Sequence, residues 1–69
     1  MKISARNTLK GKIVEIAKGA TTSHVRIDIG GGTVVTSSIT NEAVAELKLE
    51  TGKQAYAVVK ASDVMVGVD

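Results

Sequence analysis

A hydroxyl, a guanidinium and a carboxamide lie within four residues near the N-terminus, in the stretch Ser4-Ala5-Arg6-Asn7. Arginine presents several N–H groups in a fixed fork and serine adds a rotatable O–H, so together they suit a planar or tetrahedral anion. The alternative is a solvated turn before the first strand, because these polar residue types are common on protein surfaces. The four residues by themselves leave both interpretations open.

A second cation and a second hydroxyl occur near the C-terminus, in Lys60-Ala61-Ser62. If this turn meets the N-terminal one, a single cleft would hold two cations, two hydroxyls and the backbone N–H groups between them. Thr40, the expected N-cap of a short helix, would add a further hydroxyl. The pattern predicts an anion site, with pairing of Lys60 to Asp63 or Glu42 on the surface as the alternative.

Such a cluster offers donors and no carboxylate, and this decides which anions it accepts. A fully deprotonated tetrahedral dianion can accept every hydrogen bond, whereas hydrogen phosphate carries a proton that needs an acceptor. We therefore expect molybdate, tungstate or sulfate to bind in preference to phosphate.

His24 is the only histidine and follows Ser23 on a predicted strand. A single histidine without carboxylate or cysteine neighbours gives little support for metal binding or acid-base catalysis. A hydroxyl-imidazole pair could still contact an oxyanion at an interface, so Thr22, Ser23 and His24 form a second candidate site. The chain has no cysteine nucleophile and no Gly-x-Ser-x-Gly elbow, and its carboxylates are scattered. We expect neither an enzyme nor a direct metal-cation site.

The composition predicts one domain spanning residues 1–69, at a length where a single core is marginally stable. No cysteine is present for a disulfide, and the hydrophobic fraction of 43% includes only 1% aromatic residues. Small aliphatic side chains would leave apolar faces uncovered, so we predict an obligate oligomer. The net charge of +2 is too small to indicate nucleic acid, and neither a membrane-spanning run nor a signal peptide is evident. These features favour a cytoplasmic protein.

Hydrophobic alternation and β-branched residues predict strands over 9–18, 24–29, 33–39 and 53–60, with a last short strand over 64–68. In the second strand Val25, Ile27 and Ile29 would face the core. Gly11, near the start of the first strand, is expected to host a bulge or a tight bend.

The triplet Gly30-Gly31-Gly32 lies between two β-branched runs and predicts a hairpin turn, because glycine supplies the positive φ that tight turns need. A phosphate-binding loop would require a following helix, and a strand follows instead. The period then changes over 40–49, where Thr40 as N-cap and an apolar face with Val44 and Leu47 predict a short helix. We therefore predict an all-β, OB-like Greek-key barrel of about five strands, with one helix between the third and fourth long strands.

Four segments of the chain resemble the molbindin, or Mop, family of molybdate-binding proteins. They are Ser-Ala-Arg-Asn-x-Leu-x-Gly-x-Ile at 4–13, the glycines at 30–32, Ile-Thr-Asn-Glu at 39–42 and Val-Lys-Ala-Ser-Asp-Val-Met at 59–65. The resemblance implies an OB-like barrel that assembles as a hexamer, a trimer of dimers, and binds molybdate or tungstate at subunit interfaces without an organic cofactor. The same module occurs in tandem, in molybdate-responsive transcription regulators and in transporter ATPase subunits. Standing alone, it implies intracellular molybdate storage or homeostasis.

By position, the resemblance implies a main molybdate site made of Ser4, Ala5, Arg6, Lys60, Ala61 and Ser62, completed by Thr40 of a neighbouring chain. Relatives often carry a hydroxyl three positions after that threonine, where this chain has Ala43. The second candidate site departs further, because Thr22-Ser23-His24 stands where Asn-Ser-Glu is expected. A histidine in place of an acid nevertheless favours anions.

Two other functions stay open on the sequence: a nucleic-acid-binding OB module and an interaction domain without a ligand. OB modules usually stack bases on aromatic side chains over a basic groove, and Tyr56 is the only aromatic residue. In the interaction domain, Arg6 and Lys60 would simply pair with acidic residues.

Overall fold

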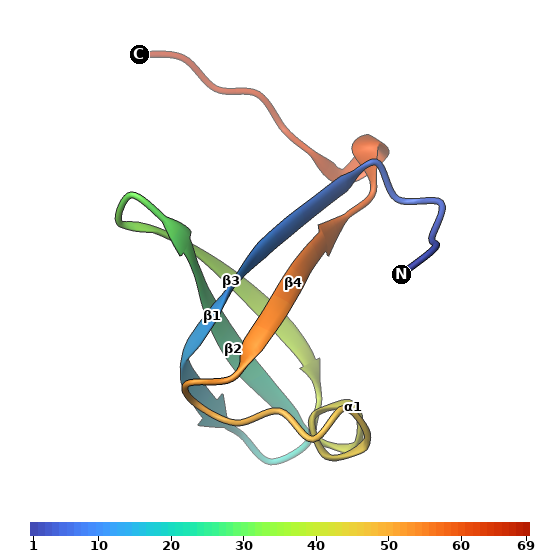
Figure 1. The fold of residues 1–69 in the computed structure, drawn as a ribbon, viewed down its shortest axis with the longest axis vertical. Coiled ribbons are helices and arrows are strands. Elements are labelled where there is room, and N and C mark those ends of the chain that lie inside the picture. The colour runs from blue at the N-terminus through green and yellow to red at the C-terminus, as the bar shows by residue number, and fades with distance from the viewer.

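The computed structural model describes all residues from 1 to 69 and contains one curled, antiparallel four-stranded sheet with a short helix at one end (Figure 1). The elements in chain order are β1 (Asn7–Lys18), β2 (Thr22–Gly30), β3 (Thr33–Thr40), α1 (Asn41–Glu46), β4 (Gln54–Val59) and the 3-10 turn η1 (Ala61–Asp63). The sheet order is β3-β2-β1-β4, so the fourth strand returns to lie beside the first. This is the Greek-key order, and it confirms the OB-like fold predicted from the sequence.

β1 is the long strand that joins the two halves of the sheet, pairing with β4 near its start and with β2 near its end. The bulge expected at Gly11 lies instead between Ile13 and Glu15, where the β1–β2 register shifts. Gly11 stays in register with β4 and serves a close approach to β2. A Cβ atom at this position would lie 2.4 Å from the backbone oxygen of Asp28. Only glycine therefore lets the two strands approach so closely here.

The glycine triplet forms the predicted hairpin turn between β2 and β3. Gly31 and Gly32 have φ values of 61° and 81°, and they separate the register partners Gly30 and Thr33. Positive φ at both central residues is typical of a type I′ turn, whose twist matches the flanking strands. Asp28 Oδ1 accepts a hydrogen bond from the Gly30 N–H at 2.8 Å and holds the start of the turn.

α1 begins where the sequence predicted and ends earlier. Thr40 is the N-cap, and its Oγ1 accepts a hydrogen bond from the Ala43 N–H at 3.1 Å. The helix ends at Glu46, short of the predicted 49, and Leu47 is 61% exposed although it was expected on the apolar face. Val44 does pack against the core, as predicted.

The early end of α1 comes from a residue with left-handed backbone geometry. Lys48 has a φ of 53°, and its N–H donates to Ala45 O at 3.1 Å. The next N–H, of Leu49, reaches back to Val44 O at 3.0 Å. These two bonds form a Schellman motif with lysine where glycine is usual.

The buried core is small, with five of the 69 residues buried: Ile13, Ser23, Val25, Ile27 and Ala57. Ile29 packs against this cluster as a partly buried residue, so the predicted inner face of β2 is confirmed. An aliphatic core of this size gives a single chain little stability.

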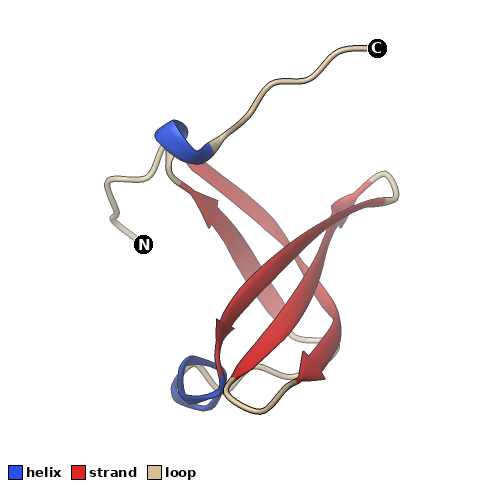
Figure 2. Ribbon diagram, turned by 180° about the vertical axis from the view of Figure 1, so that it is seen from behind, coloured by secondary structure: helices blue, strands red, loops and turns tan.

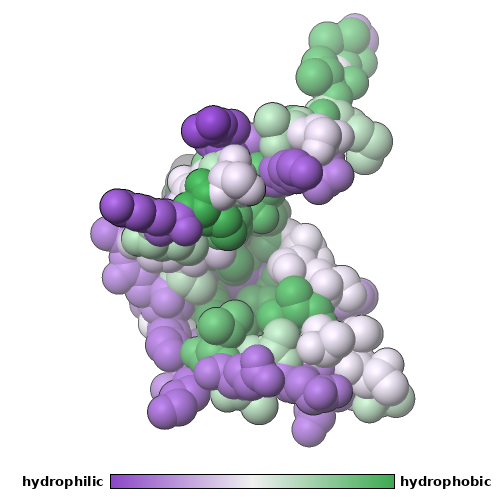
Figure 3. Space-filling model, turned by 90° about the vertical axis from the view of Figure 1, so that its right-hand side faces the viewer, coloured by the Kyte–Doolittle hydropathy of each residue, from purple (hydrophilic) through white to green (hydrophobic).

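The predicted last strand over 64–68 does not form. After η1 the chain extends away from the sheet as an apolar tail (Figures 1 and 3), in which Met65, Val66 and Val68 are 93%, 91% and 95% exposed. A strand needs a neighbour for its backbone hydrogen bonds, and no strand of the same chain pairs with residues 64–68. We refer to these residues as the apolar tail. No helix of the structure has the length and apolar character needed to cross a membrane.

Candidate oxyanion site

The N-terminal and C-terminal motifs lie side by side at one end of the sheet, next to η1 (Figure 2). Asn7 begins β1, Val59 ends β4, and the two are register partners. The Asn7 side chain adds a hydrogen bond from Nδ2 to Val59 O at 3.2 Å. Arg6 and Lys60 therefore follow the last register pair at neighbouring positions. The anion site expected from the sequence required the N-terminal and C-terminal turns to lie together, and in the structure they do.

The two cations of this end of the sheet have no carboxylate partner within the chain. The one ion pair of the molecule joins Arg26 to Glu15 at 3.1 Å, between half-exposed side chains on neighbouring strands. The alternative pairing of Lys60 with Asp63 or Glu42 is thus not formed.

The backbone after β4 turns at once, so that the residues of the C-terminal motif are exposed. The Asp63 N–H donates to Lys60 O at 2.9 Å and the Val64 N–H donates to Ala61 O at 3.3 Å, which closes η1. No hydrogen bond within the chain uses the side chains of Ser4, Arg6, Lys60 or Ser62. Two hydroxyls and two cations are therefore available to a ligand at this end of the sheet.

Thr40 lies at the opposite end of the sheet, where β3 joins α1 (Figure 1). Its register partner is Thr22, at the start of β2. Its hydroxyl oxygen accepts from the Ala43 N–H, which leaves its one proton for donation. A single chain does not bring Thr40 to Arg6, so a common site for both requires a second chain.

The residues Thr22, Ser23 and His24 do not lie on one face of β2. Ser23 points inward with 1% exposure, and its Oγ donates to Asn41 Oδ1 at 2.6 Å. Thr22 and His24 are exposed on the other face, as the alternation of a strand requires. Within one chain the Ser23 hydroxyl is therefore used by Asn41 and is not next to the imidazole.

Sequence reasoning missed the structural roles of Asn7 and Asn41. Both asparagines make side-chain hydrogen bonds to residues at least 18 positions away. Only the place of Asn7 in the N-terminal motif and that of Asn41 directly after the N-cap could have drawn attention to them.

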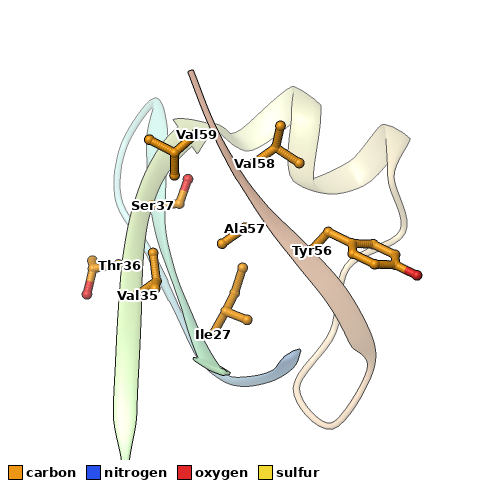
Figure 4. A pocket seen from close by; sticks show the side chains of 8 residues that line it. All are labelled: Ile27, Val35, Thr36, Ser37, Tyr56, Ala57, Val58 and Val59. Carbon is orange, nitrogen blue, oxygen red and sulfur yellow. The ribbon is translucent and has the colours of Figure 1, made fainter. Parts of the chain in front are cut away.

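The inner face of the sheet is uncovered between β3 and β4. A cavity of about 170 Å³ lies there, and Figure 4 shows Ile27 and Ala57 directed into it while Tyr56 points away. An adjoining groove of about 430 Å³ extends along Leu47 and Leu49 after the end of α1. These linings are mostly apolar, and the one lysine among them, Lys53, already donates from Nζ to Leu47 O and Lys48 O, so they do not suit an oxyanion.

The chain matches the family model of the TOBE domain over residues 3–66. It is 59% identical to a protein of Haemophilus influenzae described as a probable molybdenum-pterin-binding protein, and the match covers 100% of both chains. Among solved structures it is similar to MopII from Clostridium pasteurianum, with 46% identity, 97% of this chain and 100% of that chain covered, and a TM-score of 0.90. It is also similar to ModG, described as a cytoplasmic molybdate-binding protein and solved with molybdate bound. That match has 48% identity and a TM-score of 0.94, and covers 100% of this chain and 49% of that one.

Proposed function

Because the chain belongs to the Mop, or molbindin, family of TOBE-domain proteins, we propose that it is a non-enzymatic protein that binds molybdate. The similar structure of ModG is that of a molybdate-binding protein with molybdate bound, and the Haemophilus influenzae relative is described as a probable molybdenum-pterin-binding protein. The observation in this chain that carries the proposal is the register of Asn7 with Val59, which sets Arg6 beside Lys60. Neither cation has a carboxylate partner in the chain.

In the proposed site each group has one role. Arg6 and Lys60 neutralise the dianion, and the hydroxyls of Ser4 and Ser62 donate hydrogen bonds. Ala5 and Ala61 contribute backbone N–H groups, with side chains small enough for the anion to approach. Thr40 of a neighbouring chain completes the shell with its O–H.

We propose that the site lies between chains of a homo-hexamer arranged as a trimer of dimers. Three features support assembly: the distance between the two ends of the sheet that carry Thr40 and Arg6, the small core, and the uncovered inner face between β3 and β4. The apolar tail is a fourth, because four apolar side chains within five residues are rarely left in water. An apolar segment from another copy would cover the open face and gain the backbone partners that the tail lacks.

The proposed ligand range follows from the donor set. Tungstate has the same charge and nearly the same size as molybdate, so both should bind, whereas hydrogen phosphate brings a proton without an acceptor. The role that follows is storage or homeostasis of molybdate in the cytoplasm. The name of the Haemophilus influenzae relative favours a molybdenum-pterin compound as a second candidate ligand. The nucleic-acid alternative has no support, because Tyr56 is the only aromatic residue on which a base could stack.

We propose separately that Thr22 and His24 belong to a second oxyanion site on the outer face of β2. Ser23 could join such a site only by giving up its bond to Asn41.

Isothermal titration of the purified protein with sodium molybdate, in the absence of pterin, tests the proposal. Separate titrations with tungstate and with phosphate provide the comparison. We expect tight binding of molybdate and tungstate, close to one or more per chain, and no binding of phosphate. Absence of heat with molybdate, for protein shown to be folded and assembled, would overturn it. Binding that appears only when a molybdenum-pterin compound replaces molybdate would favour the second ligand.

A further inference from the structure

Asn41 connects the start of α1 to the loop between β1 and β2 through three hydrogen bonds and to β2 through a fourth. Its side-chain Nδ2 donates to Gly19 O at 3.1 Å and Ala20 O at 3.3 Å. Its Oδ1 accepts from Ser23 Oγ at 2.6 Å, and its backbone N–H donates to Thr21 O at 2.9 Å. One side chain thus joins two segments that are far apart in the sequence.

The bond from Ser23 belongs to the interior of the molecule. Ser23 is 1% exposed and is the one buried polar residue. A buried hydroxyl without a hydrogen-bond partner is unfavourable, and the Ser23 hydroxyl finds its partner in Asn41. Asn41 is therefore held by the core of the sheet as well as by the exposed loop.

Thr40 lies directly between this anchor and the sheet. On one side its backbone is the register partner of Thr22, and on the other side the next residue is Asn41. Its Oγ1 accepts from the Ala43 N–H, so that only its proton is left for a ligand. The direction of that proton depends on how firmly the junction of β3 and α1 is held.

We propose that Asn41, supported by Ser23, is the positioning residue that orients the Thr40 hydroxyl toward the oxyanion. This inference rests on the proposed function and deepens it, because neither Asn41 nor Ser23 would touch the anion. It predicts that molybdate affinity depends on a side chain outside the site and that this dependence acts through Thr40.

The test compares both ends of the same helix in the assembled full-length protein. Asn41→Ala removes the anchor at the start of α1, and Ser23→Ala is a milder second variant that removes one of its bonds. Lys53→Met is the matched control, because Lys53 Nζ donates to Leu47 O at 3.3 Å and Lys48 O at 2.9 Å and so holds the other end. Thr40→Val, alone and combined with Asn41→Ala, completes a double-mutant cycle.

In the titration with molybdate we expect Asn41→Ala to weaken affinity by roughly ten-fold, the effect of one misplaced hydrogen bond to a charged ligand. Lys53→Met should keep the wild-type affinity even if both variants melt at lower temperature. In the Thr40→Val background Asn41→Ala should have no further effect. Unchanged affinity in Asn41→Ala, or an effect that persists at full size without the Thr40 hydroxyl, would overturn the inference.

Hydrogen exchange of the Ala43 amide, which donates to Thr40 Oγ1, tests the positioning without any ligand. Asn41→Ala and Ser23→Ala should speed exchange at this amide, and Lys53→Met should not. Equal exchange in all variants would overturn the inference whether or not molybdate binds. Faster exchange in protein that does not bind molybdate would instead refute the proposed function and leave the positioning of Thr40 supported.

Discussion

Asn7 and Val59 face each other across β1 and β4, and Asn7 Nδ2 donates to the Val59 carbonyl oxygen at 3.2 Å. The pair is the last of the β1–β4 ladder, so Arg6 and Lys60 are the first residues beyond it. Two like charges at neighbouring positions repel each other unless an anion or solvent lies between them. The register of this one pair therefore places two cationic residues at neighbouring positions, which favours the binding of an anion there.

Replacing either cation should weaken molybdate binding strongly. We expect Arg6→Met and Lys60→Met each to lower affinity by about 10- to 100-fold, since each removes a charge-assisted hydrogen bond worth roughly 1.5–3 kcal/mol. Isothermal titration measures the loss. Lys10→Met removes the same charge as Lys60→Met from within β1, where Lys10 is the register partner of Tyr56, and should bind like the wild type. An equal loss in that control would point to a general charge effect and contradict a local site.

Removing the apolar tail should abolish assembly. A chain that ends at Asp63 lacks the exposed segment with Met65 and Val66, and we expect light scattering to give a smaller mass than for the full chain. Val34→Ser is the matched control, because it removes a valine of 46% exposure near the β2–β3 turn and should leave the mass unchanged. A truncated protein with the mass of the intact assembly would show that the tail is not part of the interface.

A methyl group at Gly11 should destabilise the sheet. In Gly11→Ala the new Cβ would lie 2.4 Å from Asp28 O and 2.7 Å from Ile27 Cγ2, so β1 and β2 must move apart. Overpacking of this kind costs about 1–3 kcal/mol in the free energy of unfolding. Urea denaturation at fixed protein concentration measures it, with Lys10→Ala as control because Lys10 is an exposed position on the same strand. Equal stability of the two variants would contradict the close approach.

Lys48→Gly should stabilise the protein. Lys48 has a left-handed backbone with a φ of 53°, which is unfavourable by about 1–2 kcal/mol for a residue with a Cβ. After the greater flexibility of glycine in the unfolded chain is subtracted, we expect a gain of roughly 0.5–1 kcal/mol in the same denaturation experiment. Lys48→Ala removes the charge and keeps the Cβ, so it should bring no such gain. A stabilisation of equal size in Lys48→Ala would assign the effect to charge.

Local features could be predicted from the sequence because the residues that determine them are neighbours along the chain. The glycine turn needs only positive φ at Gly31 and Gly32, and the N-cap needs only a hydroxyl at Thr40 just before the helix. The alternation of β2 likewise shows which side chains face inward, and Val25 and Ile27 are buried as expected. The donors of the terminal motifs indicated a tetrahedral dianion, and the resemblance to a family narrowed it to molybdate or tungstate.

Contacts between distant residues were decided only by the tertiary structure. Three features depend on which strands lie together and in which register. They are the bulge between Ile13 and Glu15, the hydrogen bond between Ser23 and Asn41, and the absence of a strand over 64–68. The alternation of a strand determines which side chains face inward, but a shift by two residues keeps the same face inward, so the pattern alone does not determine the register with a strand distant in sequence. For the same reason, the sequence shows the donors of Arg6 and Lys60, and only the fold shows that they meet.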